Sequence, residues 1–177
     1  MKKLIILWSL MYISGCATQQ IYSKQYVPTL NNGKGNVFLS VIETKKSRAF
    51  PVIHIRNTAT GEEAAANSFP LQWDAPITRM TNQKTTDFDN ETGTLILLKL
   101  QAGKYEAFKW SIFRGTAQFG VTTEYKIQNP VSFEVVADQT TYVGSFLLDS
   151  EGMHFSSDKY SRDEQSLRSK FINFSPD

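Results

Sequence analysis

The sequence predicts an all-β fold, an antiparallel β-sandwich of about seven to nine short strands with a short C-terminal helix. Short runs rich in β-branched and aromatic residues recur at near-regular spacing from residue 36 onward. Clusters of Gly, Pro, Asn and Asp separate these runs, as expected for turns between strands. The best candidate for a helix is the C-terminus.

The densest apolar run of the domain covers residues 93–113 and predicts two strands, 94–100 and 104–113. The connection Gln101-Ala102-Gly103 contains Gly and has the length of a tight turn, which predicts a hairpin. The first strand has two largely apolar faces, so it is expected in the centre of its sheet, covered on both sides. The second strand changes phase, and a β-bulge near Ala107 would reconcile its two halves.

The remaining elements follow in chain order. Alternation predicts strands over residues 36–42, 50–57, 118–127, 131–135, 140–148 and 153–155. Residues 62–66, rich in Ala and Glu, are expected to form one helical turn. Residues 68–80 contain two prolines and are at best an edge strand, and residues 81–92 are a loop. Asn129-Pro130 predicts a turn between two strands.

The C-terminal pattern predicts a helix over residues 162–171. Ser161 and Glu164 match a capping box, with Ser161 as the N-cap. Leu167 and Phe171 are four residues apart and would share the face that packs on the sheet.

The N-terminus carries a targeting signal. Lys2 and Lys3 precede an apolar run of ten residues, 4–13, which is too short to span a bilayer. The run ends in Ile13-Ser14-Gly15-Cys16, which resembles the lipobox of bacterial lipoproteins. The resemblance implies cleavage between Gly15 and Cys16, a diacylglycerol on the Cys16 sulfur, and an N-terminal acyl chain such as palmitate. Two or more acyl chains give stable membrane anchoring. An ordinary secretory signal with an incidental cysteine is the alternative.

This signal divides the chain into a signal peptide (1–15), an acylated Cys16 with a flexible tether (16–35), and one β-sandwich domain with its helix (36–177). Removing the signal leaves 17 basic and 17 acidic side chains, because Lys2 and Lys3 are lost from the total of 19. A neutral chain without basic runs does not predict nucleic-acid binding. Cys16 is the only cysteine, so an acylated chain has no thiol for a disulfide.

A second resemblance concerns the domain. Leu100-Gln101-Ala102-Gly103-Lys104-Tyr105 resembles the L-x-x-G-x-Y hairpin of prealbumin-like and carboxypeptidase-regulatory-like sandwiches, and residues 141–144 resemble a strand that follows it. The resemblance implies a prealbumin-like or Ig-like sandwich with Tyr105 pointing inward. The long segment 58–92 departs from that compact pattern.

The sequence predicts no catalytic site, no cofactor and no metal. His54 and His154 lie on the polar faces of their strands, without further ligands at a suitable spacing. The acidic stretch from Asp87 lacks the Gly and Glu that a calcium loop needs at its sixth and twelfth positions. Ser145 lies in an apolar strand without a neighbouring histidine, although a triad assembled in space is left open.

Four residues are candidates for binding a partner. Trp73 lies between two prolines, and an aromatic side chain on a loop is a favoured binding anchor, although the sequence favours a role for it as a plug at one end of the sandwich. The other three are Asp87, Phe88 and Asp89, in the acidic loop.

Together, these patterns predict a non-enzymatic lipoprotein of the bacterial cell envelope. Ala17, in place of Asp after the lipidated cysteine, favours the outer membrane, with the domain facing the periplasm or exposed at the cell surface. The expected role is to bind or scaffold another envelope protein. Two alternatives are a lipoprotein subunit of an envelope-spanning secretion machine and an envelope-acting hydrolase or carbohydrate-binding module. The sequence does not indicate the oligomeric state.

Overall fold

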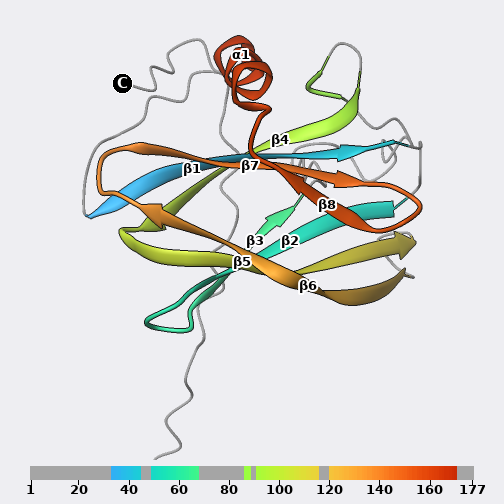
Figure 1. Cartoon of the computed structure of the whole chain (residues 1–177), viewed down its shortest axis with the longest axis horizontal. Coiled ribbons are helices and arrows are strands. Elements are labelled where there is room, and N and C mark those ends of the chain that lie inside the picture. Colours follow the sequence, from blue (N-terminus) through green and yellow to red (C-terminus); the bar gives the residue numbers. More distant parts are fainter. Residues whose placement is uncertain (1–32, 45–48, 68–85, 89–90, 116–119, 171–177) are drawn as a thin grey trace, which may run out of the picture.

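A computed structural model describes residues 33–44, 49–67, 86–88, 91–115 and 120–170. These residues form eight strands and one helix (Figure 1). In chain order the elements are β1 (Lys34–Glu43), β2 (Ala49–Asn57), β3 (Glu63–Asn67), β4 (Thr92–Gln101), β5 (Gly103–Gly115), β6 (Gly120–Val135), β7 (Thr140–Leu148), β8 (Met153–Ser156) and α1 (Tyr160–Lys170). The all-β prediction is confirmed, and the first two residues of β1, Lys34 and Gly35, lie inside the predicted tether.

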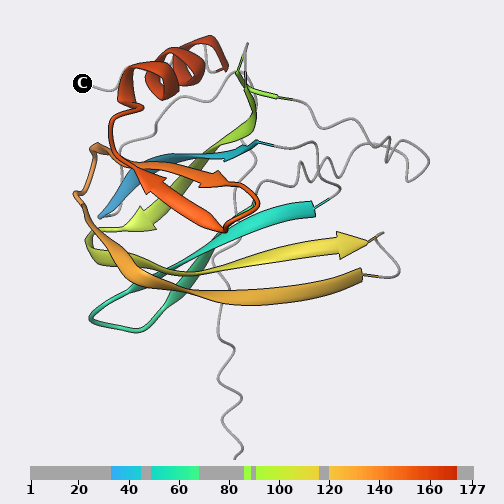
Figure 2. The ribbon, with the colours of Figure 1, turned by 45° about the vertical axis from the view of Figure 1, so that its right-hand side comes forward.

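The strands form two four-stranded sheets, with the orders β4-β1-β7-β8 and β3-β2-β5-β6. The sheets lie face to face, and α1 covers the outer face of the first one (Figure 2). All the pairs within the second sheet are antiparallel, whereas β1 and β7 run parallel. The prediction of a wholly antiparallel sandwich is therefore wrong at this pair. The chain reaches β7 from the other sheet, so no tight turn fixes its direction relative to β1.

The predicted hairpin at residues 93–113 is also wrong. β4 pairs with β1 in the first sheet, whereas β5 pairs with β2 and β6 in the second. The turn at Ala102 therefore passes the chain from one sheet to the other. β4 lies at a sheet edge and not in its centre, although side chains cover it on both faces for most of its length.

Three local predictions meet different outcomes in the second sheet. The bulge is confirmed, because the register of β5 shifts between Ala107 and Lys109 against both its neighbours. Residues 62–66 do not form a helical turn: Ala64 and Ala66 alternate inward on β3, which pairs with β2. Asn129-Pro130 is not a turn between strands. It lies within β6, which continues past four residues that have no partner on β5.

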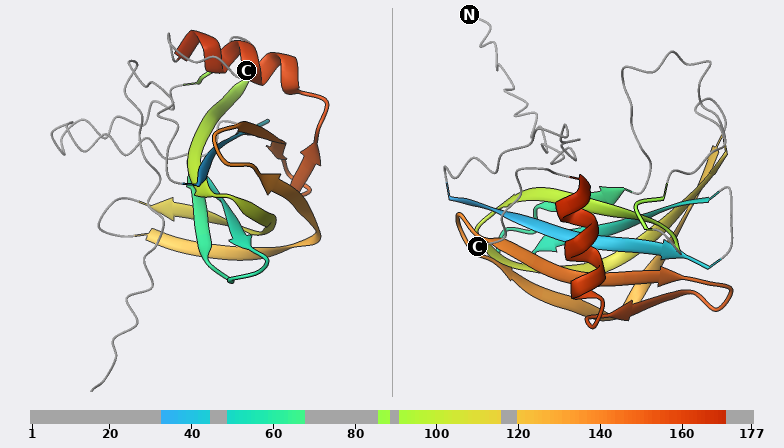
Figure 3. Two further views of the ribbon diagram at one scale, coloured as in Figure 1. Left: turned by 90° about the vertical axis from the view of Figure 1, so that its left-hand side faces the viewer. Right: turned by 90° about the horizontal axis from the view of Figure 1, so that it is seen from above.

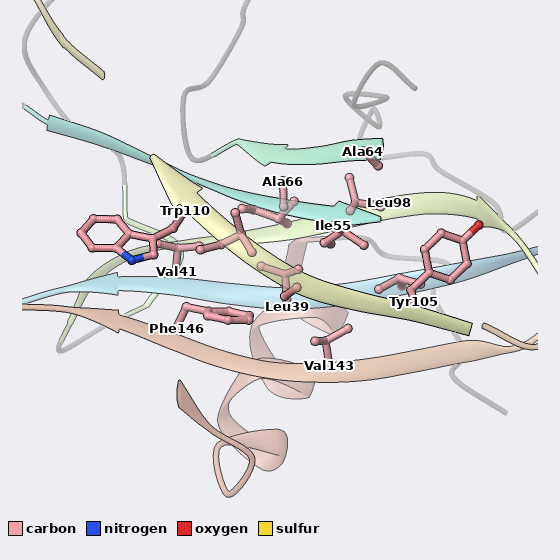
Figure 4. Packing of buried hydrophobic residues seen from close by; sticks show 14 of the residues in the cluster. Leu39, Val41, Ile55, Ala64, Ala66, Leu98, Tyr105, Trp110, Val143 and Phe146 are labelled. Atoms are coloured by element: carbon pink, nitrogen blue, oxygen red, sulfur yellow. The ribbon is translucent and has the colours of Figure 1, made fainter. Parts of the chain in front are cut away.

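The main hydrophobic core lies between the two sheets (Figure 4). Val37, Leu39 and Val41 of β1 are at most 1% exposed and face the inward residues of β2 and β5. Tyr105 is buried among them, as the sequence predicts, and its hydroxyl donates to the Gln101 carbonyl (3.0 Å). Trp110 and Phe146 belong to the same core, at the other end of the sandwich in Figure 4.

A second, smaller core lies under the helix. The alternate residues of β1 and β4 point to the outer face of the first sheet, where α1 crosses the strands (Figure 3). This core consists of Phe38, Ile42, Phe88, Leu95, Leu97 and Leu167. Strands that are apolar on both faces suit a sheet covered on both sides.

The C-terminal helix is confirmed, but its beginning is not. α1 begins at Tyr160, so Ser161 lies inside the helix and is not the N-cap. Its buried residues are Asp163 and Leu167, which are four apart and therefore share one face. Glu164 accepts from Arg168 (3.0 Å) in an i,i+4 pair on the solvent side. The predicted partner of Leu167, Phe171, lies outside the described residues.

Candidate functional site

The most concentrated polar chemistry in the described residues lies between α1 and the first sheet. Asp163 is fully buried there, at 0% exposed. Its Oδ2 accepts from the Ser40 hydroxyl of β1 (2.7 Å) and from the Tyr142 hydroxyl of β7 (2.7 Å). One carboxylate thus joins the helix to two neighbouring strands. Burial, followed by the hydrogen bond and charge of Asp163, raises the pKa of Tyr142 far above its usual value.

Arg162 supplies the positive charge of this cluster. Its Nε and Nη2 donate to Oδ1 of Asp163 (2.9 and 2.7 Å). Nη2 also lies 3.0 Å from the hydroxyl oxygens of both Ser40 and Ser145. Nη1 pairs with Glu91, and the guanidinium stacks over the Phe88 ring, 4.7 Å from its centroid. A planar, five-donor guanidinium can serve all these acceptors at once.

The strand geometry explains how two serines reach this site. Ser40 and Ser145 are direct partners in the parallel β1–β7 ladder. Their hydroxyl oxygens lie 2.9 Å apart, and both side chains are at most 3% exposed. A hydroxyl in an apolar strand must find a partner when buried, and here the two serines share one guanidinium.

The chemistry of this cluster suits a structural role, which is to hold α1 on the first sheet. A nucleophilic serine needs a nearby group that can accept its proton, and an arginine cannot serve because it stays protonated. No histidine contacts Ser145 within the described part of the chain. We therefore interpret the cluster of Ser40, Tyr142, Ser145, Arg162 and Asp163, named the helix-docking cluster below, as the device that fixes α1 on the sheet.

His54 contacts a different serine, on the outer face of the second sheet. Its Nε2 lies 2.8 Å from the Ser111 hydroxyl, a distance typical of a base beside a nucleophile. Burial lowers the pKa of His54, and the positive charge of Lys109 lowers it further, so both effects favour the neutral ring. Ser111 is only 3% exposed, however, and no described carboxylate hydrogen-bonds to the ring. The pair lacks both access and an orienting acid.

His154 lies on the other sheet from His54, on β8. Its Nε2 is 3.3 Å from Asp149, and half of its side chain is exposed. Across the described ranges, no three His, Cys, Asp or Glu side chains gather in a way that could hold a metal ion.

Two of the predicted partner-binding residues lie in the described structure. The Asp87 carboxylate accepts from the Leu95 amide (2.8 Å) and from Lys170 Nζ of α1 (2.9 Å). Phe88 is 5% exposed and packs in the core under the helix. Both residues therefore hold the segment before β4 against α1, and partner binding there stays a prediction. Trp73 and Asp89, like Gly15 and Cys16, lie outside the described residues.

Two shallow depressions occur in the described surface. One, of about 460 Å³, lies beside α1 and is lined by Thr86, Asp87, Phe88, Ser166, Ser169 and Lys170. The other, of about 310 Å³, lies at one end of the second sheet, where Tyr105 and Phe133 stack with their ring centroids 5.8 Å apart. Both are open, and the Ser166 and Ser169 hydroxyls of the first one donate to backbone carbonyls.

Sequence reasoning missed the helix-docking cluster. It assigned residues 161–164 to a helix cap and so overlooked the burial of Asp163. The available signal was Ser40 and Ser145, two hydroxyl side chains inside otherwise apolar strands. Such residues indicate a buried polar partner, but not which segment supplies it.

Comparisons with known proteins add little to this geometry. No protein-family model matches the chain, and no curated protein matches it. Among solved structures, a leucine-rich repeat protein from Bacteroides thetaiotaomicron VPI-5482 is similar at 12% identity, with a TM-score of 0.37. The match covers 64% of this chain and 13% of that one. Within the described residues, the one helix is too short and too polar to cross a membrane.

Proposed function

We propose that this protein is a lipoprotein of the bacterial outer membrane, anchored through Cys16, whose domain faces the periplasm and binds or scaffolds another envelope protein. The observation that carries the proposal is the sequence Ile13-Ser14-Gly15-Cys16 after a basic start and a ten-residue apolar run. Cys16 is also the only cysteine of the chain, which suits a residue kept for lipidation.

The domain suits an anchored binding module. Its first strand begins at Lys34, so 17 residues (17–33) separate the domain from Cys16. Fully extended, a linker of this length reaches about 55–60 Å, which gives the domain freedom to meet a partner near the membrane. We further propose that the two sheets form a prealbumin-like sandwich, supported by the turn at Gly103 and the inward Tyr105.

The surroundings of Ser111 and Ser145 favour a binding role over hydrolysis. Ser145 is held by Arg162, which cannot accept its proton, and Ser111 is buried beside His54. Catalysis requires a nucleophile that substrate can reach together with its base. Neither Ser111 nor Ser145 meets both conditions.

Metabolic labelling with a tagged palmitate, followed by membrane fractionation, tests the anchor. The unchanged chain should carry label and sediment with the outer membrane, whereas Cys16→Ser should lose the label and be released. Ala17→Asp is the matched control, because it keeps the cysteine. In an enteric host it should stay labelled but move to the inner membrane. A chain that sediments unlabelled, or is unaffected by Cys16→Ser, would contradict the proposal.

Cross-linking in intact cells tests the binding role. An envelope protein that is cross-linked to the anchored chain, and lost with Cys16→Ser, would support an anchored assembly component. Turnover of an envelope substrate that His54→Gln abolishes, with the fold intact, would overturn the non-enzymatic assignment.

A further inference from the structure

The long strand β6 is an edge strand whose first half exposes apolar side chains. It ends the order β3-β2-β5-β6, so no described strand pairs with its outer side (Figure 2). Val121 is 69% exposed and Tyr125 is 40% exposed. The Tyr125 ring is already fixed, because it stacks on Trp110 with centroids 4.2 Å apart. A long edge strand presents unpaired backbone groups that another strand can join.

The first half of β6 is regular enough for another strand to pair with it. The less exposed side chains of β6 are all odd-numbered (Thr123, Ile127, Val131, Phe133 and Val135), whereas Val121 and Tyr125 are exposed. The parity is therefore the same before and after residues 127–130, which lie opposite the bulge of β5. Within residues 121–128, β6 contains neither a proline nor an inward-pointing charge, the devices that usually protect an edge.

The charges of this strand are unbalanced within one copy. Lys126 is the direct cross-strand partner of Lys109, and two like charges in that position repel. Lys109 pairs with Glu124 (3.1 Å), and Lys126 makes no ion pair within the described residues. Glu124 is 55% exposed and keeps free acceptor capacity. Within the described residues of one copy, Lys126 therefore faces a cation and has no anion beside it.

We propose that a second copy of this chain supplies that anion, by pairing antiparallel with β6 about a two-fold axis at Tyr125. Such an axis places Glu124 of each copy opposite Lys126 of the other, and Tyr125 opposite itself. It also places Thr123 opposite Ile127 on the core-facing side and Thr122 opposite Gln128 on the outer side. The second sheets of the two copies join into one continuous eight-stranded sheet.

This charge pattern selects a second copy as the occupant. The strand reads Glu124-Tyr125-Lys126, which is complementary to itself when reversed. Each Glu124 then lies between Lys109 of its own copy and Lys126 of the other. In this register Lys126 has Lys109 on one side and Glu124 of the other copy on the other side, so the acid offsets the repulsion between the two lysines.

Cysteine substitution in the full chain tests the register. Tyr125→Cys lies on the axis, where antiparallel Cα atoms are about 4.5–5.5 Å apart, within disulfide range. It should form a covalent dimer under mild oxidation. Thr122→Cys is the matched control, because copies of residue 122 would be about 20 Å apart. We expect roughly tenfold less dimer from it. Mixing Thr122→Cys with Gln128→Cys should restore the cross-link between the two chains.

Charge reversal separates association from folding. Lys126→Glu places an acid opposite Lys109 within the monomer, so the variant should unfold at a higher temperature. In the dimer it faces the other copy's Glu124, so light scattering should show about tenfold weaker association. The double variant Glu124→Lys/Lys126→Glu restores complementarity about the axis and should dimerise again. If these charges acted only within one copy, Lys126→Glu would raise the unfolding temperature without weakening association.

The unchanged chain controls for any disulfide through Cys16. Equal cross-linking of Thr122→Cys and Tyr125→Cys would indicate random collision and overturn the proposal. A monomeric Tyr125→Cys chain, a mixed disulfide with another protein, or unchanged association of Lys126→Glu would also overturn it.

Discussion

At the scale of single residues, Asp163 connects three elements through one buried carboxylate. It accepts from a hydroxyl of β1, a hydroxyl of β7 and the neighbouring guanidinium of α1. Removing one partner from a buried ion pair leaves the other uncompensated, which usually costs more than the intact pair contributes. The stability of the helix–sheet contact should therefore respond more to Asp163 than to the exposed charges of α1.

We expect Asp163→Asn to lower the free energy of unfolding by about 3 kcal/mol, because the amide cannot accept on both atoms and leaves Arg162 without its closest anion. Urea unfolding measures this. Glu164→Gln is the control on the same helix, where loss of an exposed pair with Arg168 should cost about 0.5 kcal/mol or less. Similar costs for the two variants would mean that the helix-docking cluster does not hold α1.

His54 should make stability depend on pH. Burial and Lys109 lower its pKa in the folded protein from the usual 6.5. The unfolded chain then binds a proton that the folded chain resists, so His54 contributes fully above about pH 7 and less as the pH falls. Between about pH 7 and 5, the free energy of unfolding should decrease in the unchanged chain. The decrease should be smaller in His54→Gln, and equal slopes for both proteins would contradict the assignment.

The residue scale also shows where sequence reasoning succeeds. The buried Leu167 and the bulge beside Ala107 follow from periodicity, which is a local property, and the inward Tyr105 follows from the resemblance of its turn to a known hairpin. Asp163 was out of reach, because its hydrogen-bond partners are Ser40 of β1 and Tyr142 of β7, which lie 123 and 21 residues away in the chain. Long-range pairing has no local signature in one sequence.

At the scale of elements, the same limit explains the wrong connections. The tight turn at Ala102 has the composition of a hairpin turn, yet it joins two sheets. A turn sequence fixes the backbone of a few residues, but the partners of the flanking strands decide whether they pair. The Ala-rich β3 is another case, since pairing with β2 overrides a local preference for helix.

Gly144 of β7 allows β8 to pack closely against β7, because it has no side chain. Its φ is +143°, and a Cβ there would lie 2.3 Å from the Phe155 ring and 2.9 Å from the Ser156 carbonyl. The adjacent ladder between β1 and β7 shifts register at this point. Gly144→Ala should destabilise the domain by about 1–3 kcal/mol and displace β8.

Thermal unfolding and amide exchange measure this effect. Adding Phe155→Ala to Gly144→Ala removes the ring contact but not the backbone strain, so the double variant should recover part of the loss. Faster exchange confined to residues 153–156 is the expected signature. An unchanged exchange rate in β8 would contradict the role assigned to Gly144.

At the scale of the whole molecule, the first sheet is covered on both faces, by the second sheet and by α1 (Figure 3). A chain that ends before Tyr160 would therefore expose Phe38, Leu95 and Leu97, which are at most 3% exposed in the structure. Such a chain should bind a hydrophobic dye and aggregate while keeping its far-ultraviolet β signal. The Asp163→Asn chain is the control, because it weakens the helix contact without removing Leu167.

The parallel pairing of β1 and β7 has a consequence for synthesis. Asn36 pairs with Thr140, so 104 positions separate partners in adjacent strands. A ribosome releases the N-terminal end first, and β1 must wait, with Phe38 and Val41 uncovered, until almost the entire domain has been translated. Partial chains thus contain β1 with β4 as its one available neighbour, and only a chain that includes β7 pairs β1 on both sides. A chain cut before Thr140 would be a substrate for proteolysis and not a smaller domain.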